Sequence, residues 1–139
     1  MKVDIERVND KVHLVATNEQ GVTVHMDGSP EIGGEDLGAR PMQLILMGLG
    51  GCTSMDMLSM LAKMREQVKG YKVTVRAERA TEHPMVFTKI HIHYILEGDL
   101  KKENVEKVIK LSMDKYCSVT HMLNSTATIT HSYEIINEQ

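Results

Sequence analysis

The chain has 139 residues, which is enough for one domain with a hydrophobic core. Its 16 basic and 19 acidic residues give a net charge of −3 without a basic block, so we expect no nucleic-acid partner and no binding to a membrane surface. Residues 1–10 are charged and lack an apolar stretch, so we expect no signal peptide and a cytoplasmic protein whose two cysteines stay reduced.

Three short β-prone segments open the chain, and turn-forming residues separate them. We predict strands at residues 3–8, 12–17 and 22–27, of which two or three form an antiparallel meander. Residues 28–40 are rich in glycine and acidic residues, which predicts a loop that leads straight into the next helix.

The next segment, residues 41–67, predicts a long apolar helix. Pro41 suits a first helical position, and no charged side chain lies between Arg40 and Asp56. Apolar residues fall on all sides of the helix, which is typical of burial in a protein core or a bilayer. The uncharged run is shorter than the roughly 20 residues of a membrane span, so we expect a core helix. Because one small chain can hardly surround it, we also expect a second subunit.

Three glycines, Gly48, Gly50 and Gly51, stand within this helix. Each costs about 1 kcal/mol relative to alanine in a helix interior, so their presence needs a reason. One reason is close packing against another element. The other is a kink that leaves backbone N–H groups free beside Cys52, where they would favour a thiolate.

The second half of the chain predicts a hairpin, a helix and a final strand. Residues 71–80 and 86–97 alternate between apolar and polar side chains, as in a half-buried antiparallel hairpin. An amphipathic helix follows at about residues 100–116, with Asp99 as its N-terminal cap. Residues 126–136 predict the last strand.

Cys52 and Cys117 are the residues with the most evident chemistry. Both could be small buried hydrophobes, which is the common state of free cysteine. Alternatively, Cys52 attacks an electrophile and Cys117 then forms a disulfide with it, which requires Cα atoms no more than about 7 Å apart. Methionine, leucine and isoleucine dominate the helix around Cys52, so a pocket there would suit an apolar small molecule.

A thiolate at Cys52 would need a cation nearby. Arg40, at the end of the glycine-rich loop, is the nearest basic residue upstream, although it could equally be a solvated loop side chain. Asp56 lies four residues after Cys52 on the same helix face. A carboxylate there opposes ionisation of the thiol unless a cation neutralises it.

We predict neither a metal nor an organic cofactor. His91 and His93 point outward from one strand without a third ligand at a zinc-like spacing, and the two cysteines lie 65 positions apart. The chain lacks the glycine-rich motifs of nucleotide-binding sites and the serine motif of hydrolases. With one Phe and no Trp, it also offers little surface for stacking bases.

Two motifs resemble the OsmC/Ohr family of osmotically induced and organic hydroperoxide resistance proteins. One is Pro41 followed eleven positions later by Cys52 in LGGCTSMD, and the other is Cys117 in KYCSV after an amphipathic helix. The order of elements is similar over nearly the whole chain, which implies a single OsmC-like domain at residues 1–139. RPMQLILMGLGGCTSMD and EHPMVFTKIHIHY look closest to the YhfA-like branch.

The resemblance implies a fold and an activity. The fold would be α+β, with antiparallel sheets around a buried Cys-bearing helix, in an intertwined homodimer with active sites at the subunit interface. The activity would be thiol-dependent reduction of organic hydroperoxides. Cys52 would match the peroxidatic thiol and Cys117 the resolving one, and a dithiol reductant would restore both.

Three positions depart from the family pattern. Met42 occupies the position at which the peroxidases carry Glu. Gln43 occupies the next position, at which members of the YhfA-like branch often carry Glu. No arginine occurs some twenty residues before Cys52, so Arg40 is our candidate for that role. Three hypotheses stay open: a thiol peroxidase, a non-catalytic redox sensor or apolar-ligand binder of the same fold, and a purely structural role for both thiols.

Overall fold

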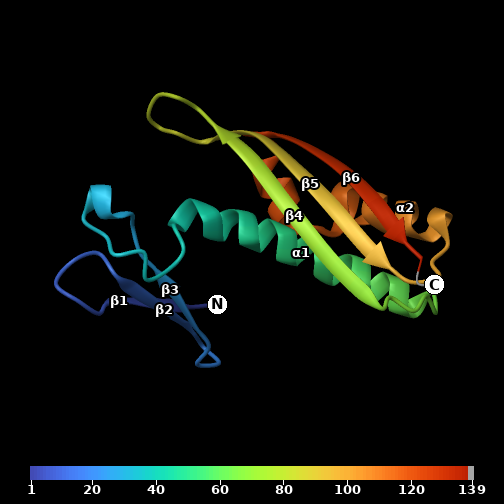
Figure 1. Cartoon of the computed structure of the whole chain (residues 1–139), viewed down its shortest axis with the longest axis horizontal. Helices are drawn as coiled ribbons and strands as arrows, with labels where there is room; N and C mark the ends of the chain where they lie inside the picture. Colours follow the sequence, from blue (N-terminus) through green and yellow to red (C-terminus); the bar gives the residue numbers. More distant parts are fainter. Residues whose placement is uncertain (138–139) are drawn as a thin grey trace. The chain divides into compact units, whose positions relative to one another are not determined.

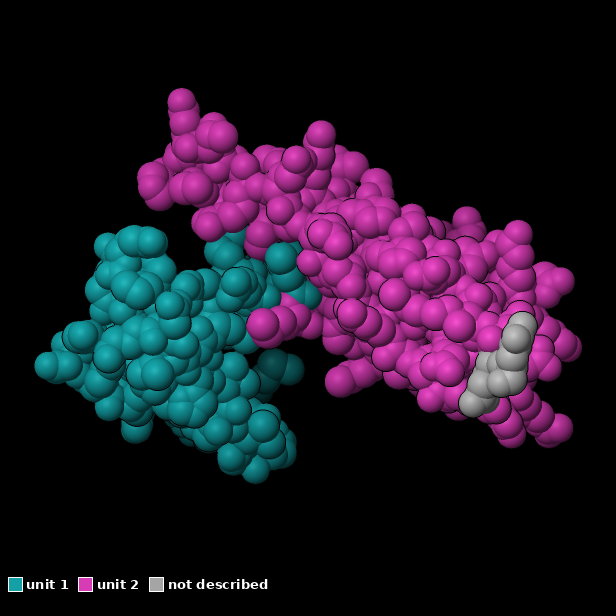
Figure 2. Space-filling view, viewed as in Figure 1, with its two compact units in different colours: residues 1–46 teal, residues 47–139 magenta. Residues whose placement is uncertain are grey.

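The structure is a computed structural model that describes residues 1–137. It has the predicted α+β composition, with two three-stranded sheets and three α-helices among the described residues. The chain divides into two compact units, residues 1–46 and residues 47–139 (Figure 2). The assignment of residues 1–139 to a single domain stays a prediction.

Unit 1 contains the predicted antiparallel meander. Its strands β1 (Val3–Arg7), β2 (Leu14–Asn18) and β3 (Thr23–Met26) pair in chain order. Apolar side chains of this sheet remain open to solvent within the chain, since Ile5 is 57% and Val24 is 42% exposed. The meander therefore lacks a well-covered core of its own.

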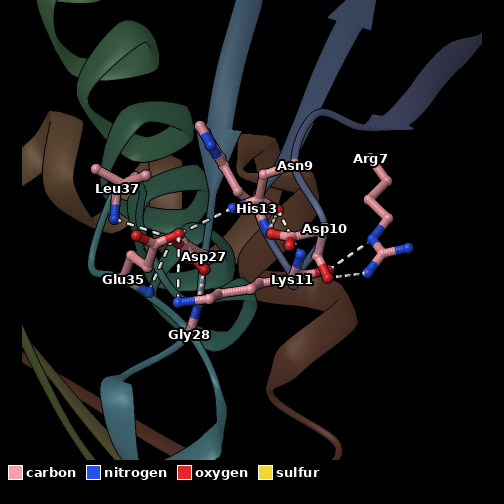
Figure 3. Close-up of polar contacts among 9 residues, drawn as sticks. All are labelled: Arg7, Asn9, Asp10, Lys11, His13, Asp27, Gly28, Glu35 and Leu37. Carbon is pink, nitrogen blue, oxygen red and sulfur yellow. Dashed lines mark hydrogen bonds and ion pairs between the residues drawn. The ribbon is translucent and has the colours of Figure 1, made fainter.

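A buried aspartate organises the loop after the meander. Residues 28–40 form the predicted loop, which includes one turn of 3₁₀ helix, η1 (Pro30–Ile32). The carboxylate of Asp27 accepts hydrogen bonds from three backbone N–H groups (Figure 3), those of Gly28 at 2.7 Å, Glu35 at 3.2 Å and Leu37 at 3.1 Å. Both ends of the loop are thereby tied to one side chain.

The surroundings of Asp27 act on its pKa in opposite directions. Burial disfavours the charged form, because the residue is only 3% exposed. The three backbone donors and the nearby His13 outweigh burial and hold the pKa of the Asp27 carboxyl below its ordinary value. The carboxylate is therefore the form that the folded loop stabilises.

The sheet of unit 2 corrects one part of the expected fold. Strands β4 (Gly70–Arg79) and β5 (Phe87–Glu97) form the predicted antiparallel hairpin. The last strand, β6 (Thr128–Ile136), pairs with β5 in parallel, so the expectation of purely antiparallel sheets is wrong. The reason is the long helical connection between β5 and β6, since parallel neighbours require a crossover of this kind.

That connection consists of α2 (Lys102–Leu111), the π-helical turn η2 (Ser112–Tyr116) and α3 (Ser118–Leu123). The predicted cap at Asp99 is wrong, because Lys101 occupies the N-cap position and no side chain caps the helix. The apolar stripe of α2 is buried as expected, and its members are Val105, Val108 and Ile109.

Helix α1 (Pro41–Lys63) begins where the sequence predicts and ends a turn earlier. It stops because Arg65 adopts a left-handed conformation with φ of 61°, which a helix cannot continue through. The helix runs without a break past its glycines, so the expected kink is absent. Close packing explains Gly50 alone, since a Cβ on Gly48 or Gly51 would have no neighbour within 4 Å. A Cβ on Gly50 would lie only 3.2 Å from Cγ2 of Val75 on β4.

The single chain does not bury α1 on all faces, and burial of its other sides by a second subunit stays a prediction. One stripe is covered, and its members are Leu49, Gly50, Thr53, Ser54, Met57 and Leu61. Outside it, Met47 is 56% and Met55 is 75% exposed. By length and composition α1 could also cross a membrane, a property that core helices of soluble proteins share.

Both longer helices of unit 2 cover the same face of its sheet. In unit 2, α1 runs along the sheet of β4, β5 and β6 (Figure 1), and Thr53 of α1 bonds to Tyr94 of β5. Tyr133, the partner of Tyr94 in register, bonds to Glu106 of α2. The inward side chains of β5 are buried as predicted: Ile90, Ile92, Tyr94 and Leu96.

Candidate redox site

The two cysteines meet in unit 2. The sulfur atoms of Cys52 and Cys117 and a carboxylate oxygen of Asp56 all lie within 4.8 Å of one another. Both cysteines are free thiols. The expectation that these two remote thiols come together is thus confirmed.

Local structure explains how each group reaches the site. Cys52 and Asp56 are one helical turn apart on α1, so their side chains share a face. Cys117 follows the π-helical turn η2, and its backbone N–H donates to the carbonyl of Ser112 at 2.8 Å. It is also the N-cap of α3, where its sulfur accepts a bond from the N–H of Thr120 at 3.4 Å.

The two thiols differ in their access to solvent. Cys117 is fully buried, whereas Cys52 is only half-buried. Burial raises the pKa of the Cys117 thiol, hydrogen bonds from Thr120 oppose this, and a hydrogen bond to Cys52 raises the pKa further. Cys117 is therefore a neutral thiol near pH 7, and Cys52 is the sulfur that a small molecule can reach.

A line of buried hydroxyl groups leads to the carboxylate. Tyr94 Oη lies 2.7 Å from Thr53 Oγ1, which lies 2.8 Å from Ser112 Oγ. Ser112 in turn donates to Asp56 Oδ2 at 3.1 Å. Because each hydroxyl has one hydrogen, Ser112 must accept from Thr53 while it donates to Asp56, and Thr53 must then accept from Tyr94.

This hydroxyl chain, Tyr94–Thr53–Ser112, gives Asp56 a fixed orientation beside the sulfurs. Burial is the main cause that raises the pKa of the Tyr94 hydroxyl, so this donor stays protonated. None of these three hydroxyls was predicted as part of a site from the sequence. A signal was present, since Ser112 interrupts the apolar stripe of its helix and Tyr94 lies among the inward residues of β5.

A cavity opens next to the carboxylate. It has a volume of about 460 Å³, within the range of small-molecule sites. Its lining is mostly apolar, with one acid and one base: Met55, Asp56, Ser59, Met60, Lys63, Leu111 and Tyr116. A small apolar guest can therefore lie beside Asp56.

Arg40 lies in unit 1, and its partners there are local. Its guanidinium forms a hydrogen bond and ion pair with Asp36, and its backbone N–H donates to Oε1 of Gln43 at 2.9 Å. Gln43 thus acts as the helix-capping residue at the third position of α1. The role of Arg40 toward Cys52 stays a prediction.

The paired histidines lie on the uncovered face of the unit 2 sheet. Rings of His91 and His93 bond to the same hydroxyl, that of Ser132, at 2.8 and 2.7 Å. His93 also lies 3.3 Å from Glu134. These histidines therefore belong to a surface network on the face opposite to the helices.

Comparison with known proteins finds matches over most of the chain. A family model described as OsmC-like protein matches residues 33–132. Protein YhfA of Escherichia coli K12 is 41% identical over 124 residues, which are 88% of this chain and 90% of that protein.

Solved structures are similar over nearly the full length. A hypothetical protein from Aquifex aeolicus VF5 has a TM-score of 0.86 at 28% identity, over 99% of this chain and 97% of that one. An organic hydroperoxide resistance protein OsmC from Legionella pneumophila has a TM-score of 0.69 at 14% identity, over 96% and 97%. At that identity the likeness concerns the fold.

Proposed function

Because the chain belongs to the OsmC-like protein family, we propose that it is a thiol-dependent peroxidase that reduces organic hydroperoxides through Cys52 and Cys117. The observation that carries the proposal is that the two sulfurs lie within 4.8 Å although they are 65 positions apart in sequence. The name of the Legionella relative, an organic hydroperoxide resistance protein, supports the same chemistry.

In the first step the Cys52 thiolate attacks the terminal oxygen of the hydroperoxide. The O–O bond breaks, the alcohol leaves after it takes up a proton, and Cys52 is oxidised to a sulfenic acid. The half-buried position of Cys52 supports its role as the attacking thiol. The cavity beside Asp56 supplies an apolar lining for the organic part of the substrate.

In the second step Cys117 resolves the sulfenic acid. Its sulfur displaces the hydroxyl group, which leaves as water, and an intramolecular disulfide forms. Full burial suits Cys117 to this role, because its thiol is shielded from reagents in solvent and lies next to Cys52. A dithiol reductant then exchanges with the disulfide and restores both thiols. This step suits a reducing compartment, and the cytoplasm is the location that we propose.

The proposed assembly is a homodimer. The exposed apolar sides of α1 and of the β1–β3 meander support it, since a second copy would cover surface that the single chain leaves open. Arg40 remains our candidate for the cation that stabilises the Cys52 thiolate. The alternative function, a redox sensor or apolar-ligand binder, is supported by Met42 and Gln43 at positions where relatives carry Glu.

Turnover tests the proposal. The wild type should consume cumene hydroperoxide with dithiothreitol as reductant, and Cys52→Ser should abolish this activity. Cys117→Ser should accumulate the Cys52 sulfenic acid, which dimedone traps. Ser118→Ala, an exposed neighbour of Cys117, is the control and should retain full turnover.

Two results would contradict the peroxidase. Equal activity in Cys52→Ser would remove Cys52 from the chemistry. A wild type that forms the 52–117 disulfide once, seen as the loss of two hydrogens by mass spectrometry, without further peroxide consumption would favour the redox sensor.

A further inference from the structure

We propose that reduced Cys52 and Cys117, together with Asp56, bind a thiophilic divalent cation, for which Zn²⁺ is the best match. Among residues 1–137, these three side chains form a cluster that could hold a metal ion. Their ligand atoms all lie within 4.8 Å of one another. The site needs only two thiols and a carboxylate, so it does not depend on the peroxidase chemistry.

The spacing suits a tetrahedral ion. Zinc binds thiolate sulfur at about 2.3 Å and carboxylate oxygen at about 2.0–2.2 Å, so its ligand atoms lie about 3.3–3.8 Å apart. Closing from at most 4.8 Å to that separation requires the ligand atoms to approach one another by no more than about 1.5 Å.

Surrounding contacts orient two of the three ligands. The hydroxyl chain that ends at Ser112 holds Asp56 through a 3.1 Å bond to Oδ2, which leaves the other carboxylate oxygen free for a metal. The same residue anchors Cys117, whose N–H donates to the Ser112 carbonyl. Support of this kind for ligating carboxylates is typical of metal sites.

Charge and softness select the ion. Two thiolates and a carboxylate carry three negative charges in a half-buried site. A divalent cation neutralises two of them. Thiolate ligands favour zinc and similar soft ions over Mg²⁺ or Ca²⁺. Binding releases the two thiol protons, and three protein ligands leave a fourth position for water.

The site would be controlled by redox state. A disulfide between Cys52 and Cys117 removes both thiolates, so metal binding and disulfide formation exclude each other. Oxidation would release the ion, and the bound ion would slow alkylation of Cys52. Cation binding therefore competes with formation of the disulfide, and the binding itself needs no oxidant or reductant.

Cobalt titration tests this site. Co²⁺ added to wild-type protein, reduced with a phosphine and freed of thiols, should bind at one equivalent with a sulfur-to-cobalt charge-transfer band, which Zn²⁺ then bleaches. Cys52→Ser should lose the band, and Asp56→Asn should weaken binding at least tenfold. Ser112→Ala should weaken binding about tenfold, because it removes the hydrogen bond that orients the ligand Asp56.

Matched controls keep the test independent of folding. Asp114→Asn, an exposed acid on the neighbouring turn, should bind as the wild type does. Wild type carrying the 52–117 disulfide should give no band, and this form needs no substitution. Circular dichroism checks that each variant is folded.

Three outcomes would overturn the site: no charge-transfer band at equimolar Co²⁺, an unchanged band in Cys52→Ser, or unchanged affinity in Asp56→Asn. Weak binding without the band would point to the half-buried histidines His91 and His93 on the sheet surface. Peroxide turnover is read in a separate assay, so loss of the peroxidase leaves this result standing, and the reverse holds as well.

Discussion

The two compact units bury their apolar side chains to very different extents. In unit 2, Ile92 on β5 is 0% exposed beneath α1 and α2. In unit 1, Ile5 on β1 is 57% exposed, although it belongs to a sheet that also has three strands. Similar β-prone patterns therefore lead to a covered sheet only where helices pack on it.

The two units also differ in the polar groups that they bury. Unit 1 buries one carboxylate, Asp27, which satisfies backbone groups of a loop. Unit 2 buries hydroxyls, which run from Tyr94 through Thr53 and Ser112 to the side chains beside the thiols. The first network shapes the backbone, and the second orients a reactive group.

The largest effect is expected from the core of unit 2. Ile92→Ala should lower the free energy of unfolding by about 2–5 kcal/mol, because it leaves a cavity in a packed core. Urea denaturation at fixed protein concentration measures this loss. A change below 1 kcal/mol would mean that the core under α1 relaxes around the gap.

The matched substitution in unit 1 is Ile5→Ala. In a free chain it should change stability by no more than about 0.5 kcal/mol, because the side chain is exposed. If the loss is as large as that of Ile92→Ala and grows on dilution, a second copy covers this sheet. That result would break the contrast and support the proposed homodimer.

The hydroxyl chain comes next. Thr53→Val removes its middle member at nearly constant volume and leaves Ser112 and Tyr94 with a missing partner. We expect a loss of about 1–3 kcal/mol, measured by thermal and urea unfolding. Thr128→Val, on the exposed surface of β6, is the control and should be nearly neutral. Equal losses of stability for Thr53→Val and Thr128→Val would show that the buried hydroxyl chain adds nothing to stability.

Asp27→Asn should destabilise unit 1 in a pH-dependent way. The folded pKa of Asp27 is lowered, so its contribution is present above the unfolded pKa and is lost as pH falls through the folded value. The difference from wild type should thus be full at pH 7 and shrink below about pH 4. Amide exchange at Gly28, Glu35 and Leu37 should accelerate. A difference that grows on acidification would contradict this account.

A small effect on stability is expected for Arg40→Ala. Its ion pair with Asp36 is partly exposed, so the loss should be about 0–1 kcal/mol. If Arg40 also stabilises the Cys52 thiolate, iodoacetamide should alkylate Cys52 more slowly at pH 7 in the variant, while Arg7→Ala leaves the rate unchanged. Equal alkylation rates in all three proteins would exclude Arg40 from the site.

Local patterns in the sequence determined most elements. Proline at position 41 marked the start of α1, and alternation located β4 and β5 because side chains of a strand alternate between faces. Boundaries failed where backbone geometry intervenes, as at Arg65, whose left-handed conformation no periodicity reveals. Residue pattern also placed each cysteine on or beside a helix.

The tertiary structure alone decided how those elements meet. Sequence gives no distance between positions 52 and 117, because it depends on the crossover that carries β6 back parallel to β5. The same packing buries Tyr94, Thr53 and Ser112 together and turns Asp56 toward the sulfurs. Local propensities act over a few residues, whereas a redox or metal site is made by contacts between residues far apart in the chain.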